Sequence, residues 1–506
     1  MCGIFASNDP LVSFEHNKIL DEHLKFRGPD FQSNIIKHKN WFIYHARLAV
    51  IGLSEKYNQP YECSDGSTLL FNGEIFNYKE LSLKKLNIKN AVSDTDILSK
   101  LIIKKNFDYN WLDGFFALIR ISKNGKLLNC ARDPFGVKPL FYYKRKNFIT
   151  ICSEPIVIKK IFKLKINKKA FKEYFLFRAP LFSESYFKKI NTVKPGNCLT
   201  EGNHFDLLKE FLKKKKNKKN LDIILKRSIK LRMRSDAKIG LLLSGGIDSN
   251  LIRYNIPRVD YFSGGFTDDF DYKYLKKNNI KVNFTKVTKS NFLKRLRKLI
   301  YLRGEPLSVP NEVVLSLIAK NAKRKKIKVL MSGDGADEFF GGYDRVFDWS
   351  LKNRFTVEKF CDFYCYNKIN KDSLEFLNLK KFFNKLKKLS CFEKVKFFFI
   401  KFHLPILLRR LDFSLMSEGI EGREPFLSKE VFIESMKYNK NELMRDKLGK
   451  RPLRTISKKY FGQKFASLKK VGFPIDMSRI IKYKNGRISN YNLWFRLNQK
   501  ILMELK

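Results

Sequence analysis

The chain has 506 residues, of which 44% are hydrophobic, and a formal net charge of +52. This length exceeds what one hydrophobic core usually serves, so at least two domains are expected. The sequence contains no run of about 18 apolar residues and no signal-peptide pattern, and its eight scattered cysteines are too few for a disulfide scaffold. These features favour a cytoplasmic protein over a membrane-spanning or secreted one.

The positive charge is spread along the chain as lysine, which accompanies abundant Phe, Ile and Asn. A genome rich in A and T produces the same pattern without selection for a partner. The densest basic run, Lys213 to Lys219, is typical of a solvated connection between domains. The sequence carries no RNA- or DNA-binding fingerprint, so we expect no specific nucleic-acid partner, although salt-dependent binding to polyanions follows from the charge alone.

The first 200 residues are predicted to be rich in strands. Apolar, β-branched or aromatic runs are separated by Gly, Asp and Asn clusters, and they cover Trp41 to Leu53, Ser67 to Tyr78, Phe115 to Ile121, Leu127 to Ala131 and Pro139 to Tyr143. Ser93 to Lys105 has the spacing of an amphipathic helix. The pattern predicts stacked sheets with flanking helices.

Cys2 lies directly behind Met1, and removal of Met1 would leave its thiol beside a free α-amine. The unperturbed pKa of that amine is about 8, so it can act as the base for a nucleophilic thiol. A cysteine at this position is weak evidence alone. It gains weight from the motifs that follow in order: Arg27 to Asp30, His45 to Leu48, Phe71 to Ile75, Ser93 to Asp96 and Ala131 to Leu140.

On these motifs the first half resembles the glutaminase domain of the class II amidotransferases, an N-terminal-nucleophile αββα sandwich. The resemblance implies that Cys2 attacks the side-chain amide of glutamine, with the Asn72 side chain and the Gly73 backbone N–H as oxyanion hole. It also implies that Arg47, Glu74 and Asp96 bind the α-carboxylate and α-ammonium groups of glutamine. Two plainer readings stay open, because Asn72-Gly73 also suits a hairpin turn and Arg47 a surface ion pair.

From about Leu221 the pattern changes to short apolar runs alternating with helical segments, which predicts a parallel α/β sheet. The expected strands are Ile239 to Leu243, Val259 to Gly264, Val282 to Val287 and Ile327 to Met331. The expected helices are Leu221 to Arg232, Phe292 to Tyr301 and Glu312 to Lys323.

Two glycine-rich loops follow expected strands in this half. Ser244 to Ser249 lacks the Gly-Lys-Ser/Thr ending of a Walker A loop, but its glycines and the following helix N-terminus suit a phosphate, and Asp248 suits Mg²⁺. The second loop, Met331 to Tyr343, holds Asp334 and Asp337 among repeated glycines. An N-capped helix start would not explain those glycines, so the loops favour metal–pyrophosphate binding.

The loop pair resembles the ATP pyrophosphatase family, and with the first half it resembles the glutamine-hydrolysing asparagine synthetases. Further matching segments are Gly304 to Pro306, Gly419 to Leu427, Lys450 to Arg454 and Lys470 to Pro474. The resemblance implies a glutaminase domain at 1–200, a Lys-rich linker at 201–220, and at 221–506 an ATP pyrophosphatase-type α/β domain with extra C-terminal helices.

The same resemblance implies ATP and Mg²⁺ as cofactors. A substrate carboxylate attacks the α-phosphate of ATP, pyrophosphate leaves, and ammonia from the first site displaces AMP. By the same resemblance, Asp248 and Asp337 would hold Mg²⁺, Asp334 would orient or deprotonate ammonia, and Lys450 would stabilise charge on the phosphates. A dry internal tunnel between the two sites is expected. The implied ATP-binding residues are Leu243, Ser244, Gly245, Gly246, Asp248, Ser249, Gly264, Ser332 and Gly333.

The leading interpretation is synthesis of asparagine from aspartate. The stretch Glu305 to Glu312 resembles family members of sugar or secondary metabolism, so a paralogue that amidates another carboxylate is the alternative. The segment after Asp268 is also short for the family. Lactam-forming relatives have no use for an intact Cys2. A basic nucleic-acid-binding protein on an enzyme scaffold is a distant alternative, and a homodimer stays open.

Overall fold

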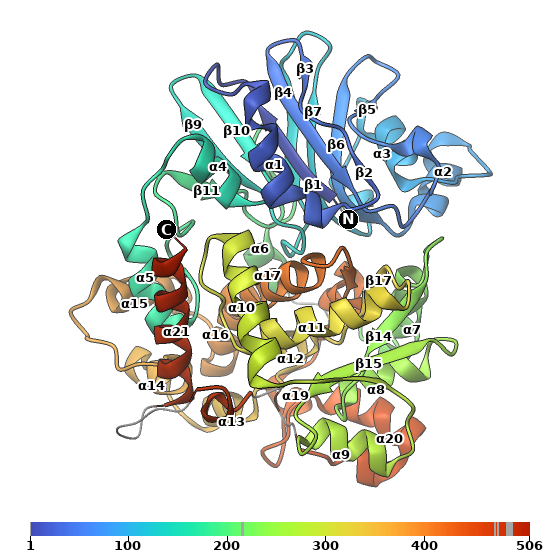
Figure 1. Ribbon diagram of the computed structural model, residues 1–506. Coiled ribbons are helices and arrows are strands. Elements are labelled where there is room, and N and C mark those ends of the chain that lie inside the picture. Colours follow the sequence, from blue (N-terminus) through green and yellow to red (C-terminus); the bar gives the residue numbers. More distant parts are fainter. Residues whose placement is uncertain (1, 214–216, 470–471, 473–474, 482–488, 506) are drawn as a thin grey trace.

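The computed structural model describes residues 2–213, 217–469, 472, 475–481 and 489–505. Met1, residues 214–216 of the basic run, and the segment Lys470 to Pro474 except Gly472 lie outside the described residues. The described chain forms two stacked antiparallel sheets followed by a helix-covered parallel sheet (Figure 1). This is the predicted fold class.

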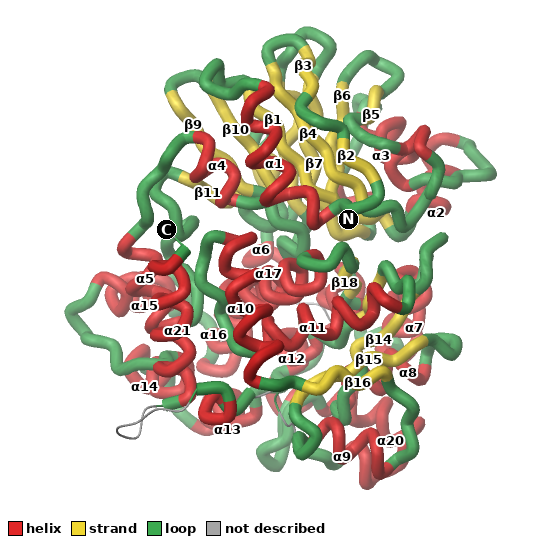
Figure 2. Tube along the Cα trace, viewed as in Figure 1, coloured by secondary structure: helices red, strands yellow, loops and turns green. Residues whose placement is uncertain are grey.

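The N-terminal part consists of two antiparallel sheets with helices on their outer faces (Figure 2). The first sheet has seven strands: β1 (Cys2–Ser7), β2 (Phe31–Gln32), β3 (Ile36–His38), β4 (Trp41–Arg47), β9 (Phe141–Arg145), β10 (Phe148–Cys152) and β11 (Ile190–Thr192). The second has six: β5 (Tyr61–Glu62), β6 (Thr68–Ile75), β7 (Gly114–Ile121), β8 (Leu127–Arg132), β12 (Asn197–Cys198) and β13 (Gly202–Asn203).

Alternation along β1 fixes which side chains enter the space between the sheets. Cys2, Ile4 and Ala6 pack in the core between the two sheets. Phe5, on the opposite face, packs with the outer helices α1 (Asn17–Leu24) and α4 (Pro155–Ile161). Helices α2 (Tyr78–Leu86) and α3 (Asp94–Ile102) cover the outer face of the second sheet. Cys2 therefore begins a central strand with its side chain directed into the sandwich.

The C-terminal part is built on a five-stranded parallel sheet in the order β16-β15-β14-β17-β18. Its strands are β14 (Ile239–Leu242), β15 (Asp260–Gly265), β16 (Asn283–Lys286), β17 (Val329–Met331) and β18 (Glu421–Arg423). Helices α7 (Leu221–Arg232) and α8 (Ile247–Tyr254) cover one face, and α10 (Lys289–Arg303) and α11 (Asn311–Arg324) cover the other. The chain runs from β14 to β15 on one side and later adds β17 on the other side of β14, so the strand order reverses at β14. In such sheets ligands bind in the crevice at the carboxyl ends of the strands at this point.

The remaining helices connect and extend these two parts. They are α5 (Lys168–Phe177), α6 (Leu207–Leu212), α9 (Phe270–Lys277), α12 (Ala336–Phe340), α13 (Asp344–Lys352), α14 (Val357–Tyr364), α15 (Leu374–Asn384), α16 (Cys391–Phe398), the π-helical turn η5 (Phe399–His403), α17 (Leu404–Met416), α18 (Lys429–Ser435), α19 (Lys440–Leu443), α20 (Arg451–Ala466) and α21 (Asn490–Glu504). Helices α13 to α21 form the predicted C-terminal extension.

The two parts meet over a packed and charged boundary. The Phe135 ring, from the N-terminal part, lies 5.5 Å from the rings of both Phe339 and Phe432. Arg232 on α7 pairs with Asp113 at 2.6 Å, and the arginine side chain is fully buried. The chain end marked N lies at this boundary (Figure 1). The start of β1 is therefore close to the parallel-sheet part.

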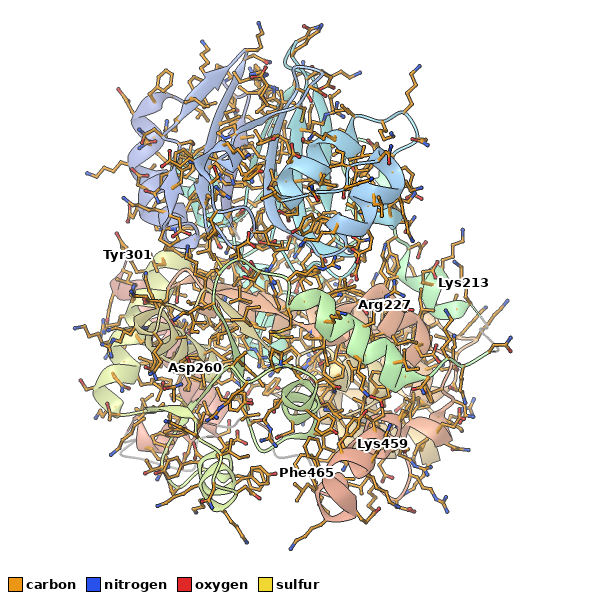
Figure 3. The ribbon with its side chains drawn as sticks, turned by 90° about the vertical axis from the view of Figure 1, so that its right-hand side faces the viewer. Lys213, Arg227, Asp260, Tyr301, Lys459 and Phe465 are labelled. Atoms are coloured by element: carbon orange, nitrogen blue, oxygen red, sulfur yellow. The ribbon has the colours of Figure 1, made fainter. Side chains whose placement is uncertain are left out.

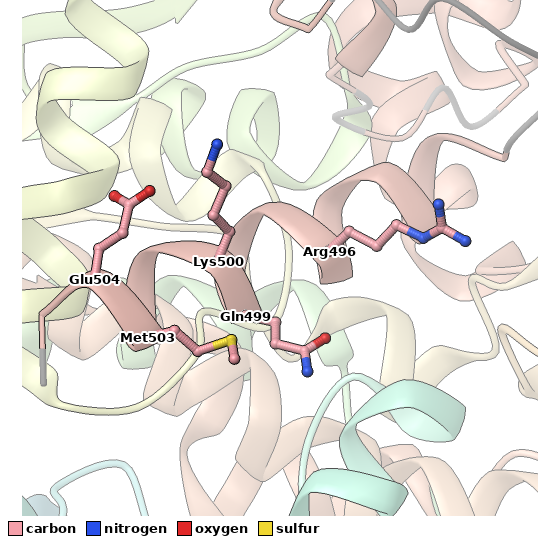
Figure 4. Close-up of a pocket in the computed structure, with 5 residues that line it drawn as sticks. All are labelled: Arg496, Gln499, Lys500, Met503 and Glu504. Atoms are coloured by element: carbon pink, nitrogen blue, oxygen red, sulfur yellow. The ribbon is translucent and has the colours of Figure 1, made fainter.

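Charged side chains lie mainly at the surface. Lys213, Arg227 and Lys459 have side chains that are about half to two-thirds exposed (Figure 3). A shallow hollow on α21 is lined by Arg496, Gln499, Lys500, Met503 and Glu504, and it contains no residue of the predicted sites (Figure 4). Within the described ranges, every helix is too short or too polar to cross a membrane.

Candidate active site

The predicted nucleophile lies against the predicted oxyanion residue. The backbone N–H of Cys2 donates to Asn72 Oδ1 at 2.8 Å, and both residues are buried. The Asn72 Nδ2 group is buried and has no hydrogen-bond partner among the described residues. Because a buried donor without a partner is costly, this amide is available to a substrate oxygen beside the thiol. Asn72 and Gly73 lie inside β6, so the hairpin-turn reading is wrong.

Gly73 occupies a position that no other residue fits. Its φ is +154°, and a Cβ atom there would lie 2.0 Å from the carbonyl oxygen of Phe115 on the neighbouring strand. The glycine lets β6 and β7 approach closely next to Asn72. Glycine is therefore required at position 73 both for its backbone conformation and for the lack of a side chain.

Arg47 lies directly opposite Cys2 in the β1–β4 pairing, so the two side chains share a face of the sheet. Its guanidinium donates to the carbonyl oxygen of Ser54 at 3.0 Å and to Asn58 Oδ1 at 2.9 Å. No carboxylate of the described chain pairs with it, and only 5% of the residue is exposed. The surface ion-pair reading is wrong, and the buried positive charge stays available to an anion.

The acidic residues beside β6 divide into two groups. Glu74 and Asp94 are buried neighbours, and Asp94 accepts from the backbone N–H of Ile75 at 3.0 Å. Burial and the neighbouring carboxylates raise the pKa of Glu74 well above its usual range. Asp96 instead pairs with Lys100 at 2.8 Å and accepts from the Tyr61 hydroxyl. The structure thus places Asp94, which was not among the predicted site residues, beside Glu74.

The first glycine-rich loop connects β14 to α8, as predicted. Ser244 and Ser249 hydroxyls are 3.0 Å apart, and the Gly245 N–H donates to Asp271 at 2.8 Å. A cavity of about 730 Å³ opens beside the loop. Of the predicted nucleotide residues, those that line it are Leu243, Ser244, Asp248, Ser249, Gly264, Ser332 and Gly333; Gly245, Gly246 and Lys450 are not part of the lining.

Lys450 links the two acidic loops. Its Nζ lies 2.5 Å from Asp248 Oδ2 and 2.6 Å from Asp337 Oδ1, and 5% of the residue is exposed. Burial alone lowers the pKa of Lys450, but the two carboxylates outweigh it and hold the pKa above its usual value. The two carboxylates therefore converge on one cation position at the carboxyl ends of β14 and β17.

Asp334 is held by a residue that no local sequence signal indicated. Its Oδ1 accepts from Arg410 Nη2 at 2.5 Å, and its Oδ2 accepts from the Ser332 hydroxyl. Arg410 lies on α17, far from the loop in sequence, and lines the same cavity. The pair places one acidic and one basic group beside the predicted phosphate site.

Two arginines connect the centres across the domain boundary. Arg27 donates to the Cys2 carbonyl oxygen at 3.1 Å and to Asp412 of α17 at 2.9 Å. Arg423 on β18 lies 3.9 Å from Glu74 and pairs with Glu421 at 2.6 Å. The nucleophile strand and the acidic pair are thus each tied to the parallel-sheet half.

Comparisons with known proteins agree with this arrangement. The profile of the family described as "Asparagine synthase" matches residues 220–488, and that of the "Glutamine amidotransferase domain" matches residues 1–211. Asparagine synthetase (glutamine-hydrolyzing) 1 of Bacillus subtilis is 26% identical, over 98% of this chain and 89% of its own length.

Two other relatives match shorter stretches. A putative asparagine synthetase (glutamine-hydrolyzing) 2 of Methanocaldococcus jannaschii is 30% identical over 68% of this chain and 76% of its own. A probable asparagine synthetase of Acanthamoeba polyphaga mimivirus is 29% identical over 68% of each chain. The chain therefore belongs to the asparagine synthase family, as an ATP-using, glutamine-hydrolysing amidotransferase ligase that acts on a carboxylate.

Proposed function

We propose that the protein hydrolyses glutamine at Cys2 and transfers the ammonia to an acyl-adenylate formed from ATP and a carboxylic acid. The acceptor suggested by family membership is aspartate, so the product would be asparagine (EC 6.3.5.4). The boundaries proposed from the sequence, 1–200, 201–220 and 221–506, assign one centre to each domain. We place the reaction in the cytoplasm.

In the glutaminase centre, the thiolate of Cys2 attacks the glutamine amide carbon. The spare Nδ2 donor of Asn72 and the backbone N–H of Gly73 stabilise the resulting oxyanion. Arg47 holds the α-carboxylate, because its guanidinium is bonded to neutral acceptors alone. For the α-ammonium we propose the buried pair of Glu74 and Asp94 in place of Asp96, whose charge Lys100 already neutralises.

One observation carries the synthetase half of the proposal: Asp248 and Asp337 converge on a single cation position, filled by the Lys450 ammonium. Two carboxylates that leave room for phosphate oxygens and water are the ligand set Mg²⁺ prefers, so these residues fit the ion. When bound, Mg²⁺ would neutralise charge on the phosphates. Lys450 would then donate to phosphate oxygens.

The remaining polar groups of the cavity act on the acceptor and the ammonia. Arg410, held in place by Asp334, directs its positive charge at the reacting carboxylate and α-phosphate. Asp334 then accepts a proton as ammonia adds to the acyl-adenylate and AMP leaves. A second acceptor candidate is a different carboxylate, favoured by the segment Glu305 to Glu312. Glu312 holds that segment by accepting from the Ser308 hydroxyl at 2.8 Å and from Arg303 at 2.9 Å.

The test is a product assay with the purified full chain, MgATP, glutamine and a panel of carboxylic acids that includes aspartate. AMP, pyrophosphate and glutamate are followed together, with Cys2→Ser as control. We expect an acceptor to support AMP formation in the wild type, and ammonium chloride to replace glutamine in C2S. Glutamate release without AMP for every acceptor would contradict the ligase half, and AMP formation with glutamine in C2S would contradict the role of Cys2.

A further inference from the structure

The cavity beside the phosphate loop has two chemically different ends. One end is apolar and adjoins the sheet, where it is lined by Leu242, Phe262, Leu315 and Ile318. The other end is aromatic and cationic, and we call it the aromatic end; it is lined by Arg178, Tyr343, Tyr364, Tyr366 and His403. The volume of about 730 Å³ lies in the upper part of the range for small-molecule sites, so there is room for a nucleotide and a second ligand.

The proposed reaction does not use Arg178, which lies at the aromatic end. It is 7% exposed, and its guanidinium lies over the Tyr366 ring at 4.9 Å and within 3.3 Å of His403 Nδ1. In the described part of the chain it forms no ion pair with a carboxylate, and its Nε has no hydrogen-bond partner. The tyrosine rings around the guanidinium stabilise its charge, but no described carboxylate neutralises it. A buried charge without a counter-ion is unusual in proteins.

The backbone at Arg178 carries a further cost. The residue follows α5 with φ +71° and ψ −5°, a left-handed position that glycine normally fills, at roughly 1–2 kcal/mol for other residues. Among the described non-glycine residues with positive φ, the two that are buried are Arg178 and Lys450. Lys450 is the lysine between the two acidic loops. A side chain kept at such a position is expected to have a use there.

The distance between the two cationic groups of the cavity sets the size of a ligand that would reach both. His403, Leu407 and Arg410 all line the cavity from one face of the helix formed by η5 and α17. Seven residues of helix correspond to a rise of ~10 Å between His403, which contacts Arg178, and Arg410, which contacts Asp334. The two carboxyl groups of aspartate are separated by only two carbon atoms.

We propose that Arg178 and His403 form an anion subsite for the far end of the acceptor, which is a carboxylic acid longer than aspartate with a second anionic group. The reacting carboxylate lies at Arg410, and the body of the acceptor packs against the tyrosine rings. The assignment of the reacting end rests on the proposed function. The subsite favours the second acceptor candidate, a carboxylate other than aspartate, and specifies it as an extended dianionic acid. The subsite itself is defined by the buried guanidinium, which has no carboxylate partner among the described residues.

The test measures binding without nucleotide or glutamine, so that it does not depend on catalysis. Adipate and hexanoate, which share a chain length and differ in the second carboxylate, are titrated into the full chain by calorimetry. Variants are Arg178→Gln, Arg178→Lys and, as a matched loss of charge at the surface, Arg227→Gln. Glutaminase turnover reports folding, because Arg178 contacts none of the proposed glutamine-binding residues.

We expect the wild type and R227Q to bind adipate about tenfold or more tightly than hexanoate, because a charge-assisted hydrogen bond contributes this much. R178Q should lose the preference for adipate, while its hexanoate binding and its glutaminase turnover stay unchanged. R178K should retain part of the preference for adipate. Equal binding of both acids by the wild type, or an equal loss of both in R178Q, would overturn the subsite. Selective binding without adipate-dependent ATP–pyrophosphate exchange would support the subsite and count against the acyl-adenylate step.

Discussion

Replacement of Glu424 by Gln should change how the stability of the protein depends on pH. Glu424 follows β18 at the domain boundary and is 2% exposed. Burial raises the pKa of its carboxyl to about 8, opposed by Lys138 and reinforced by Asp334, Asp412 and Glu421. Between 4.5, its ordinary pKa, and about 8, the folded protein keeps a proton that the unfolded chain has released. The contribution of Glu424 to the free energy of unfolding therefore falls as the pH rises through this window, by roughly 1.4 kcal/mol per pH unit.

The assay is urea unfolding of the wild type and E424Q at pH 5.5, 6.5 and 7.5, followed by tryptophan fluorescence. The difference in free energy of unfolding, wild type minus variant, should fall by roughly 3 kcal/mol across these two pH units, because the amide does not titrate. Glu430→Gln, a partly exposed carboxylate on α18, serves as the control and should show no comparable trend. If the difference for E424Q is constant with pH, Glu424 does not keep a proton in the folded protein over this range.

Four further substitutions test individual residues of the two centres. Asp94→Asn should raise the KM for glutamine roughly tenfold or more and leave ammonia-dependent synthesis unchanged. Asp96→Asn should raise the KM for glutamine less. A larger effect of Asp96→Asn would indicate that Asp96, not Asp94, binds the α-ammonium group. Lys450→Met should lower AMP formation by about a hundredfold or more with glutaminase turnover intact, measured in the same reaction. Gly73→Ala should lower the melting temperature and abolish glutamine hydrolysis, because its Cβ would meet the Phe115 carbonyl oxygen at 2.0 Å; wild-type turnover would contradict this account.

The elements with strong periodicity were predictable from the sequence. The helix predicted at Leu221 to Arg232 is α7, and the strand predicted at Ile239 to Leu243 is β14, which ends at Leu242. Short apolar runs bounded by turn residues specify such elements locally. Strand β18 at Glu421–Arg423 carries no such signal, because two of its three residues are charged. Glu421 and Arg423 pair with each other, and Arg423 also lies 3.9 Å from Glu74, which is distant in sequence.

The site residues also divide into those that a local motif indicates and those that only the fold brings together. Local motifs indicated Cys2, Asn72 and the two acidic loops. In the loops, glycines and carboxylates lie next to each other in the sequence. The choice between Asp94 and Asp96 depends on which of the two side chains the start of α3 directs toward Glu74. Residues two positions apart on a helix point in different directions, so the sequence alone does not decide between them. Arg178 and Arg410 reach the cavity from helices remote in sequence, so only the fold brings them there.

Transfer of the glutamine amide nitrogen to the acceptor shows whether the two centres work as one enzyme. Glutamine labelled with ¹⁵N in the amide is supplied with MgATP and an active acceptor in the presence of excess unlabelled ammonium, and the product is analysed by mass spectrometry. Arg27 and Arg423 connect the two centres, so we expect ammonia to pass between them inside the protein. The product amide should therefore carry ¹⁵N, and glutamate and AMP should form in equal amounts. An unlabelled product, or AMP formed without matching glutamate, would contradict the account.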